Sequence, residues 1–410
     1  MEFREQQLDN GLQVIAECNP AAYSTALGFF VNTGSRDENG ELWGVSHFLE
    51  HMVFKGTPKR SAADVNRELD ELGSQSNAFT SEEQTVYYAK VLPELQSQVL
   101  ELLCDILRPS LREEDFELEK QVILEEIAKY EDQPPYGAHE KCMAVHFGDH
   151  PLARSVLGTN DSVGSLTPEQ MRGYFEHRYS PGNITLAAAG NVDFDQLADD
   201  AQRWSGSWQP YSAARETPAA SGKTGFRLIE KPSSVQQYVV QVADGPAAED
   251  EQRYAARLLS TIVGDDSGSR LFWDLVDTGL AEYASMGAYE FQGAGIMMTF
   301  LACEPDQASD NLARIRDAFV EVQRDGVTEA ELTRAKSKTC SHIILQSERP
   351  TSRLFSVGSN WVQRREYKTV RQLVDSYRSI TCDDIQQFLK RFPLTTNTTV
   401  AVGPLTELSV

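Results

Sequence analysis

Residues 43–57, WGVSHFLEHMVFKGT, hold the pattern from which the rest of the chain can be interpreted. His47 and His51 are four positions apart, so on a helix both imidazoles lie on one face and can reach one metal ion. Glu50 follows His47 by three positions and projects to the same side, where a carboxylate can take a proton from a metal-bound water. Phe48 and Met52 indicate that the other faces of this helix are buried.

The alternative is a pair of core histidines with a salt-bridged glutamate. Such a polar face is costly to bury without a partner ion, which favours a metal site. A catalytic zinc needs a third protein ligand and one open position. The expected helix at residues 113–131 offers Glu119 and Glu126, seven positions apart on one face, and either could close the site, although glutamates on so acidic a helix more often face solvent. Glu125 is turned by about 100° and is expected to face solvent.

Five segments resemble, in this order and spacing, the pitrilysin family of zinc peptidases, whose inverted H-x-x-E-H signature defines the inverzincins. The similarity is greatest with short bacterial members and with the β-type subunits of mitochondrial processing peptidases. It is strong over residues 10–195 and weaker in the second half of the chain. The segments are HFLEHMVFKGT (47–57), LGSQSNAFTSEEQTVYYAKVL (72–92), EKQVILEEIAKYEDQP (119–134), FGDHPLARSVLGT (147–159) and RYSPGNITLAAAGNVD (178–193).

The resemblance implies a role for each residue of the site. His47, His51 and Glu126 match the zinc ligands, because the family's ligand is the second of two glutamates seven apart. Glu50 matches the general base. Glu119 matches the carboxylate that orients a histidine ligand. The implied cofactor is one Zn²⁺ ion.

Residues 76–88, SNAFTSEEQTVYY, match the family's edge strand, to which the substrate adds as a further strand. Asn77 and Ala78 match the Asn-Ala pair that holds the substrate backbone. Recognition through the main chain tolerates many substrate sequences. Without the resemblance, Asn77 would be interpreted as a turn residue.

The second half departs from the family pattern at one position. Residues 269–287, SRLFWDLVDTGLAEYASMG, align with a segment in which an arginine and a tyrosine seven apart stabilise the oxyanion. Tyr283 matches the tyrosine, but Val276 stands where the arginine is expected. The resemblance therefore implies a chain that works slowly alone or with a partner that supplies the arginine.

The organisation of the chain predicts an α+β fold of two homologous domains, each a mainly antiparallel sheet backed by helices. A segment rich in Ser, Ala, Gly and Pro lies at the midpoint and predicts a linker at 206–225. The zinc-binding catalytic domain is then expected at 1–205 and its homologue at 226–410. Both halves begin and end with strands and have helices between them.

Composition limits the functional classes. The chain has 410 residues and a net charge of −23, which argues against nucleic acid as a partner and favours basic peptides. The sequence has no run of 18 apolar residues, so we expect no membrane span. Its N-terminal segment has no apolar stretch, so we expect no secretory signal. Six scattered cysteines predict reduced thiols and a cytoplasmic location.

Together these features predict a zinc metalloendopeptidase that cleaves peptides or unfolded segments with zinc-activated water and Glu50 as general base. The family's closed chamber needs four such domains and this chain supplies two, so a homodimer or a heterodimer with a paralogue is expected. Two alternatives remain. One is a zinc-bearing structural subunit with weak or no catalysis. The other is the catalytic half of a heterodimer whose partner supplies the missing arginine.

Overall fold

The computed structural model describes residues 1–211 and 213–409. These form two compact units that do not correspond to a single division of the sequence. Unit 1 consists of Met1–Ala128, Arg154–Glu216 and Leu345–Lys368. Unit 2 consists of Lys129–Ala153, Thr217–Ile344 and Thr369–Val410.

The centre of unit 1 is a six-stranded sheet with the order β1-β2-β6-β3-β5-β4. Its strands are β1 (Glu2–Gln7), β2 (Gln13–Cys18), β3 (Thr25–Val31), β4 (Gln75–Thr80), β5 (Thr85–Val91) and β6 (Ile184–Gly190). All neighbours are antiparallel except β2 and β6, which are parallel. Strand β4 pairs only with β5 and forms an edge of this sheet.

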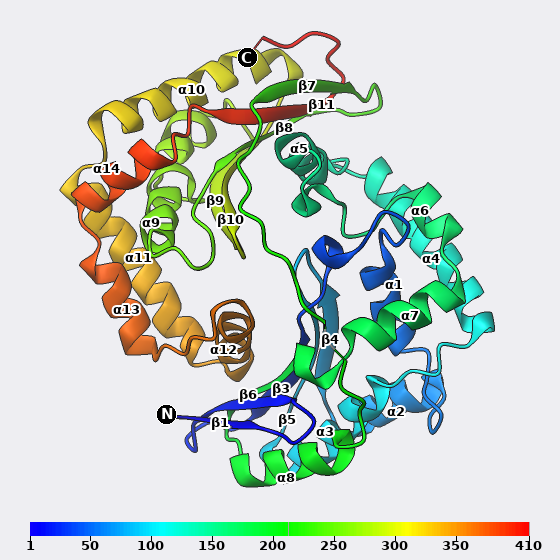
Figure 1. The fold of residues 1–410 in the computed structure, drawn as a ribbon. Helices are drawn as coiled ribbons and strands as arrows, with labels where there is room; N and C mark the ends of the chain where they lie inside the picture. Colours follow the sequence, from blue (N-terminus) through cyan, green and yellow to red (C-terminus); the bar gives the residue numbers. More distant parts are fainter. Residues whose placement is uncertain (212, 410) are drawn as a thin grey trace. The chain divides into compact units, whose positions relative to one another are not determined.

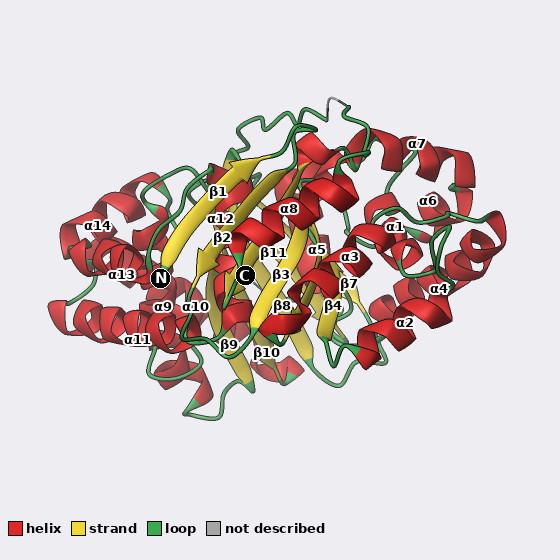
Figure 2. Cartoon of the chain, turned by 90° about the horizontal axis from the view of Figure 1, so that it is seen from below, coloured by secondary structure: helices red, strands yellow, loops and turns green. Residues whose placement is uncertain are grey.

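Helices cover both faces of the unit 1 sheet (Figure 2). One face packs against α1, α3 and α8, and the opposite face packs against α12. Strand β3 is buried at every position because its side chains alternate between these two layers. The helices of unit 1 are α1 (Val45–Val53), α2 (Ala62–Glu71), α3 (Gln96–Ile106), most of α4 (Glu113–Asp132), α6 (Asn160–Ser165), α7 (Pro168–Arg178), α8 (Phe194–Ser205) and α12 (Pro350–Arg364).

Unit 2 repeats this topology in a five-stranded sheet with the order β7-β11-β8-β10-β9. Its strands are β7 (Gly225–Glu230), β8 (Gln237–Asp244), β9 (Tyr283–Phe291), β10 (Ala294–Cys303) and β11 (Asn397–Gly403). Among the described residues of this unit, the parallel pair is β7 with β11, in the place that β2 and β6 take in unit 1. Two α+β domains with one shared topology confirm the predicted fold class.

The helices of unit 2 also form two layers. Helix α9 packs against β9 and β10, while α5 packs against β8 and β11 on the other face. Within the described residues, no helix combines the length and the apolar composition needed to cross a membrane. The helices are α5 (Ala138–Phe147), α9 (Arg253–Gly264), α10 (Ala308–Asp325), most of α11 (Glu329–Ser347), α13 (Val370–Ser379) and α14 (Cys382–Arg391).

Each sheet has one face covered by a helix from the other half of the sequence. Helix α5 lies in the first half but belongs to unit 2, and α12 lies in the second half but belongs to unit 1 (Figure 1). The sequence expectation placed one boundary at 206–225 and contained no such exchange. The physical reason for the exchange is that both faces of each central sheet are apolar and need a covering layer. A buried ion pair between Arg353 of α12 and Glu17 of β2 adds a polar link within unit 1.

Candidate metal centre

The buried side chain of Glu38 accepts hydrogen bonds at the start of α1. Glu38 accepts hydrogen bonds from the backbone N–H groups of Gly44 (2.7 Å) and Ser46 (2.8 Å). These groups lie at the N-terminus of α1, where backbone N–H groups have no acceptor within the helix. Gly44 has a φ of 90°, and a Cβ atom there would lie 2.7 Å from the carbonyl oxygen of Leu157, so only glycine fits. Burial raises the pKa of Glu38 to about 8.

Helix α1 has one apolar side and one polar side. Phe48 and Met52 are almost fully buried in the core of unit 1. The Phe48 ring stacks on Phe116 of α4 with the ring centroids 4.6 Å apart, which holds α4 against α1. On the polar side, the imidazoles of His47 and His51 have their centroids 4.7 Å apart.

Glu126 of α4 faces both histidines. Its Oε2 atom lies 3.8 Å from Nε2 of His47 and 3.7 Å from Nε2 of His51. One ligand atom from each of the three residues falls within 4.8 Å of the others. Burial, together with the neighbouring His51, lowers the pKa of His47 to about 4, so this imidazole is neutral at physiological pH and available as a ligand.

The environment of His47 provides a test of whether a metal ion fits. The residue is only 8% exposed, and its Nδ1 atom has no hydrogen-bond partner among the described residues. Its Nε2 atom lies too far from Glu126 for a hydrogen bond. A metal ion bound at Nε2 would give this nitrogen the partner that Glu126 does not provide. Two nitrogens and one carboxylate oxygen are also a ligand set that zinc uses in catalytic sites. The residues present therefore fit a zinc ion.

Glu119 holds the second histidine from behind. Its Oε1 atom accepts a hydrogen bond from Nδ1 of His51 at 2.9 Å, and its Oε2 atom lies 2.5 Å from Nζ of Lys55. Burial alone would raise the pKa of Glu119, but the hydrogen bonds from Lys55 and His51 outweigh it and the pKa is lowered. The ionised carboxylate keeps the His51 proton on Nδ1, which leaves the Nε2 lone pair directed at the centre.

Glu50 lies beside the ligands and is held by an edge-strand residue. Its Oε2 atom accepts a hydrogen bond of 2.6 Å from the Thr80 hydroxyl. Burial raises the pKa of Glu50, while the Thr80 hydrogen bond acts in the opposite direction. The Glu50 side chain is thus held at the end of β4, beside the candidate ligands.

Asn77 and Ala78 lie in the middle of β4, paired in register with Tyr88 and Tyr87 of β5. Asn77 is exposed and Ala78 is half-buried. The Ala78 N–H donates to the Asn77 side-chain oxygen at 2.9 Å. The strand that contains both residues ends at the threonine that holds the general-base candidate, so the open edge and the histidine-glutamate cluster belong to one site.

The remaining candidates lie outside this cluster. Glu125 is exposed on α4. Tyr283 begins β9 in unit 2, is 42% exposed, and donates a hydrogen bond of 3.3 Å to Asp266. Val276 ends a short π-helical turn and is half-buried against the core of unit 2. The structure brings together the zinc-ligand candidates, Glu50, Glu119 and β4, and it leaves Tyr283 in the other unit.

Three residues of the site were not anticipated from the sequence. Thr80 could have been found, because strand alternation places it on the same face as Ala78. Glu38 and Lys55 carry no such signal. Glu38 lies in a polar loop with no periodicity, and Lys55 lies beyond the end of α1.

The fold and the site define a zinc-protease-like protein of two related domains. Two family models match the chain: insulinase, peptidase family M16, over residues 13–160, and the peptidase M16 inactive domain over residues 165–339. All three candidate ligands and Glu50 fall within the first match. The chain belongs to the insulinase family, peptidase family M16, which confirms the pitrilysin-type resemblance.

Relatives support this assignment over almost the whole chain. A protein of Mycobacterium tuberculosis is 33% identical over 93% of this chain and 89% of its own length. A protein of Streptomyces coelicolor is 33% identical over 98% of this chain and 90% of its own length. A protein of Bacillus subtilis is 30% identical over 92% of this chain and 92% of its own length. Each of the three is named an uncharacterized zinc protease.

Solved structures share the fold. A protease from Helicobacter pylori superimposes with a TM-score of 0.92 at 21% identity, covering 98% of this chain and 99% of that one. A peptidase M16 inactive domain from Pseudomonas fluorescens has a TM-score of 0.91 at 19% identity over the full length of both chains. A chain of complex III from Candida albicans has a TM-score of 0.86 at 18% identity, covering 99% and 97%.

Proposed function

We propose that the chain is a zinc-dependent endopeptidase that hydrolyses extended or unfolded peptide segments. The observation that carries the proposal is the convergence of His47, His51 and Glu126 beside a held carboxylate, Glu50. A subunit without catalysis has no need for both the ligand set and the base.

The open edge of β4 supports an extended substrate. A peptide added to this edge pairs through its backbone, so its sequence matters little. Asn77 and Ala78 lie in the middle of this strand, and the family resemblance assigns them to binding of that backbone. Because β4 ends at Thr80, which contacts Glu50, a peptide paired along this edge passes close to the general base. The net charge of −23 adds an attraction for basic peptides.

The chain's own residues divide the chemistry between them. A bound zinc ion would polarise the scissile carbonyl and make water a stronger nucleophile. Glu50 accepts the proton of the attacking water and passes it to the leaving amine. The Thr80 hydroxyl fixes the orientation of that carboxylate. Glu119 and Lys55 fix the orientation of His51.

Assembly completes the proposal. The family chamber requires four domains, so we infer a homodimer or a heterodimer with a paralogue, located in the cytoplasm. Tyr283 is assigned to oxyanion stabilisation by the family pattern alone. Val276 in place of an arginine favours two alternatives. One is a zinc-bearing subunit with weak or no catalysis. The other is the catalytic half of a heterodimer whose partner supplies the arginine.

Glu50→Gln tests the proposal, with Glu125→Gln as the matched control on an exposed glutamate. The purified chain, its two variants and their zinc content are compared with a quenched fluorescent peptide as substrate. Glu50→Gln should keep zinc and lose turnover by about 10²-fold or more, because it removes a proton acceptor and no ligand. The control should match the parent chain. Hydrolysis by the parent that is no faster than by Glu50→Gln would favour the non-catalytic subunit.

A further inference from the structure

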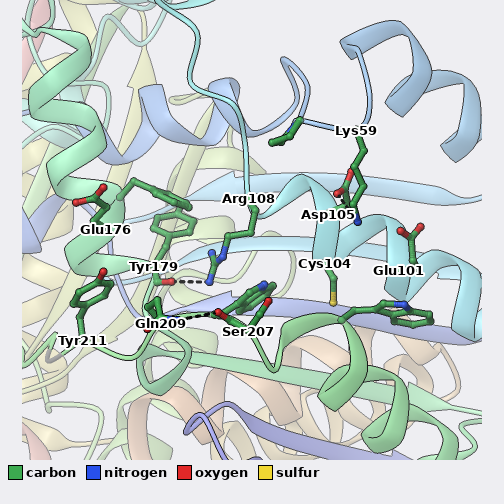
Figure 3. A pocket seen from close by; sticks show the side chains of 14 residues that line it. Lys59, Glu101, Cys104, Asp105, Arg108, Glu176, Tyr179, Ser207, Gln209 and Tyr211 are labelled. Carbon is green, nitrogen blue, oxygen red and sulfur yellow. Dashed lines mark hydrogen bonds and ion pairs between the residues drawn. The ribbon is translucent and has the colours of Figure 1, made fainter.

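Unit 1 contains a cavity that does not belong to the metal centre. Its volume is about 440 Å³, within the range of small-molecule sites. The wall is formed by α3, the ends of α7 and α8 with the residues that follow them, and the loop at Lys59 (Figure 3). None of its lining residues is a candidate zinc ligand, the general base or part of β4.

Arg108 lies in the middle of this wall (Figure 3). Its guanidinium lies over the Trp208 ring at 3.7 Å from the centroid and at 5.4 Å from that of Phe175. It donates to the carbonyl oxygens of Leu107 (2.7 Å) and Tyr179 (3.1 Å). Both acceptors are neutral, so the guanidinium has two backbone hydrogen bonds and two aromatic contacts but no counter-ion.

The acidic groups of the wall do not neutralise Arg108. Glu101 and Asp105 are each paired with Arg60, at 2.6 Å and 2.9 Å. Glu176 is exposed and lies on the opposite side of Arg108 from these two residues (Figure 3). Among the described residues, no carboxylate lies within ion-pair distance of Arg108.

Burial lowers the pKa of the Arg108 guanidinium to about 10, and it therefore stays charged at neutral pH. A charged group of this kind is stabilised by an anion that can accept its remaining N–H donors. A guanidinium that stacks on aromatic rings keeps these donors in its plane, which suits a carboxylate with two oxygens.

Aromatic side chains form much of the rest of the wall, beside polar residues that include Lys59, Ser207 and Gln209. Trp204 and Phe175 are partly exposed, Tyr211 adds a further exposed ring, and Trp208 is buried with the Arg108 guanidinium over its ring. Cys104 is buried there, and burial raises the pKa of its thiol, so it offers no reactive thiolate. The cavity thus combines the Arg108 guanidinium with aromatic side chains, while Nζ of its other cationic residue, Lys59, lies 3.5 Å from Oδ1 of Asp105.

We propose that this cavity binds a small carboxylate carried on an aromatic body, with the carboxylate on Arg108 and the ring against the partly exposed aromatic side chains of the wall, Trp204 and Phe175. The carboxylate can come from a free amino-acid-like molecule or from the C-terminal residue of a peptide. Binding here is independent of hydrolysis at the metal centre.

The test is calorimetric titration of the zinc-loaded full chain with N-acetyl-L-tryptophan and with its amide, which lacks the carboxylate. The acid should bind at least about tenfold more tightly than the amide, since a bidentate charged contact is lost. Arg108→Gln should reduce the affinity for the acid to the affinity for the amide. Arg203→Gln, which alters an exposed arginine of α8, should leave the preference unchanged.

Several results would overturn the proposal. One is equal binding of acid and amide, or no saturable binding, by the parent chain; this comparison holds even where Arg108→Gln fails to fold. Another is an acid preference that survives Arg108→Gln, as expected for a probe held at the zinc. A final titration with Gly-Gly-Gly-Trp on the Glu50→Gln chain separates the two sources. Tighter binding than N-acetyl-L-tryptophan identifies a peptide C-terminus, and equal binding identifies the free acid.

Discussion

Glu38→Gln should change how the stability of unit 1 depends on pH. Glu38 is buried at the start of α1, and burial raises its pKa from 4.5 to about 8. The folded state therefore binds this proton more tightly than the unfolded state. The resulting stabilisation is fully present below about pH 4.5 and is lost as the pH rises through about 8. At about 1.4 kcal/mol per pKa unit, the full effect is about 5 kcal/mol.

The measurement is urea unfolding followed by tryptophan fluorescence at pH 5, 7 and 9, at one free zinc concentration. Between pH 5 and pH 9 the parent chain should lose about 4 kcal/mol more unfolding free energy than Glu38→Gln, because glutamine cannot ionise. Other titrating groups contribute equally to both chains and cancel in the difference. Glu41, exposed in the same loop, provides the control, and Glu41→Gln should follow the parent. If Glu38→Gln and the parent lose stability in parallel, the reasoning from burial is refuted.

Three further predictions concern the metal and the oxyanion. Glu126→Gln should lose zinc while Glu125→Gln retains about one ion per chain; equal metal content in both would disprove the ligand assignment. Glu119→Gln removes the acceptor behind a ligand imidazole and should weaken zinc binding by about 10–100-fold in competition with a chelator, whereas unchanged affinity would show that the contact has no positioning role. Val276→Arg should raise peptide turnover by up to about 10²-fold, with Tyr283→Phe removing most of the gain; the same rate in all these chains would exclude this segment from the chemistry.

The sequence alone was sufficient where spacing within one element determines geometry. His47, Glu50 and His51 share a helix, so the 3.6-residue period places them on one side without knowledge of the fold. The same period places Glu119 and Glu126 on one face of α4. It does not say which glutamate meets the histidines, and the family resemblance was needed to choose Glu126. In the structure Glu126 faces both Nε2 atoms and Glu119 meets Nδ1 of His51.

The family resemblance identified Asn77 and Ala78, and strand alternation in β4 could also have indicated Thr80. The sequence showed Val276 in place of the family's arginine because residues 269–287 align with the family segment without gaps. Its consequence depends on the partner residues at the site, which one chain's sequence does not contain.

The contacts that only the tertiary structure decided join residues far apart in the chain. Glu38 caps α1 through a loop with no periodic pattern, and Arg108 acquires its aromatic neighbours from α7 and from the segment that follows α8. The exchange of α5 and α12 between the two units also has no local signal. The amphipathic pattern of a helix predicts that one of its faces packs on an apolar surface. The pattern does not indicate which of two similar sheets provides that surface. The pairing of helix and sheet depends on how well their surfaces fit and on long-range ion pairs such as Arg353 with Glu17. These contacts form only once the chain has folded.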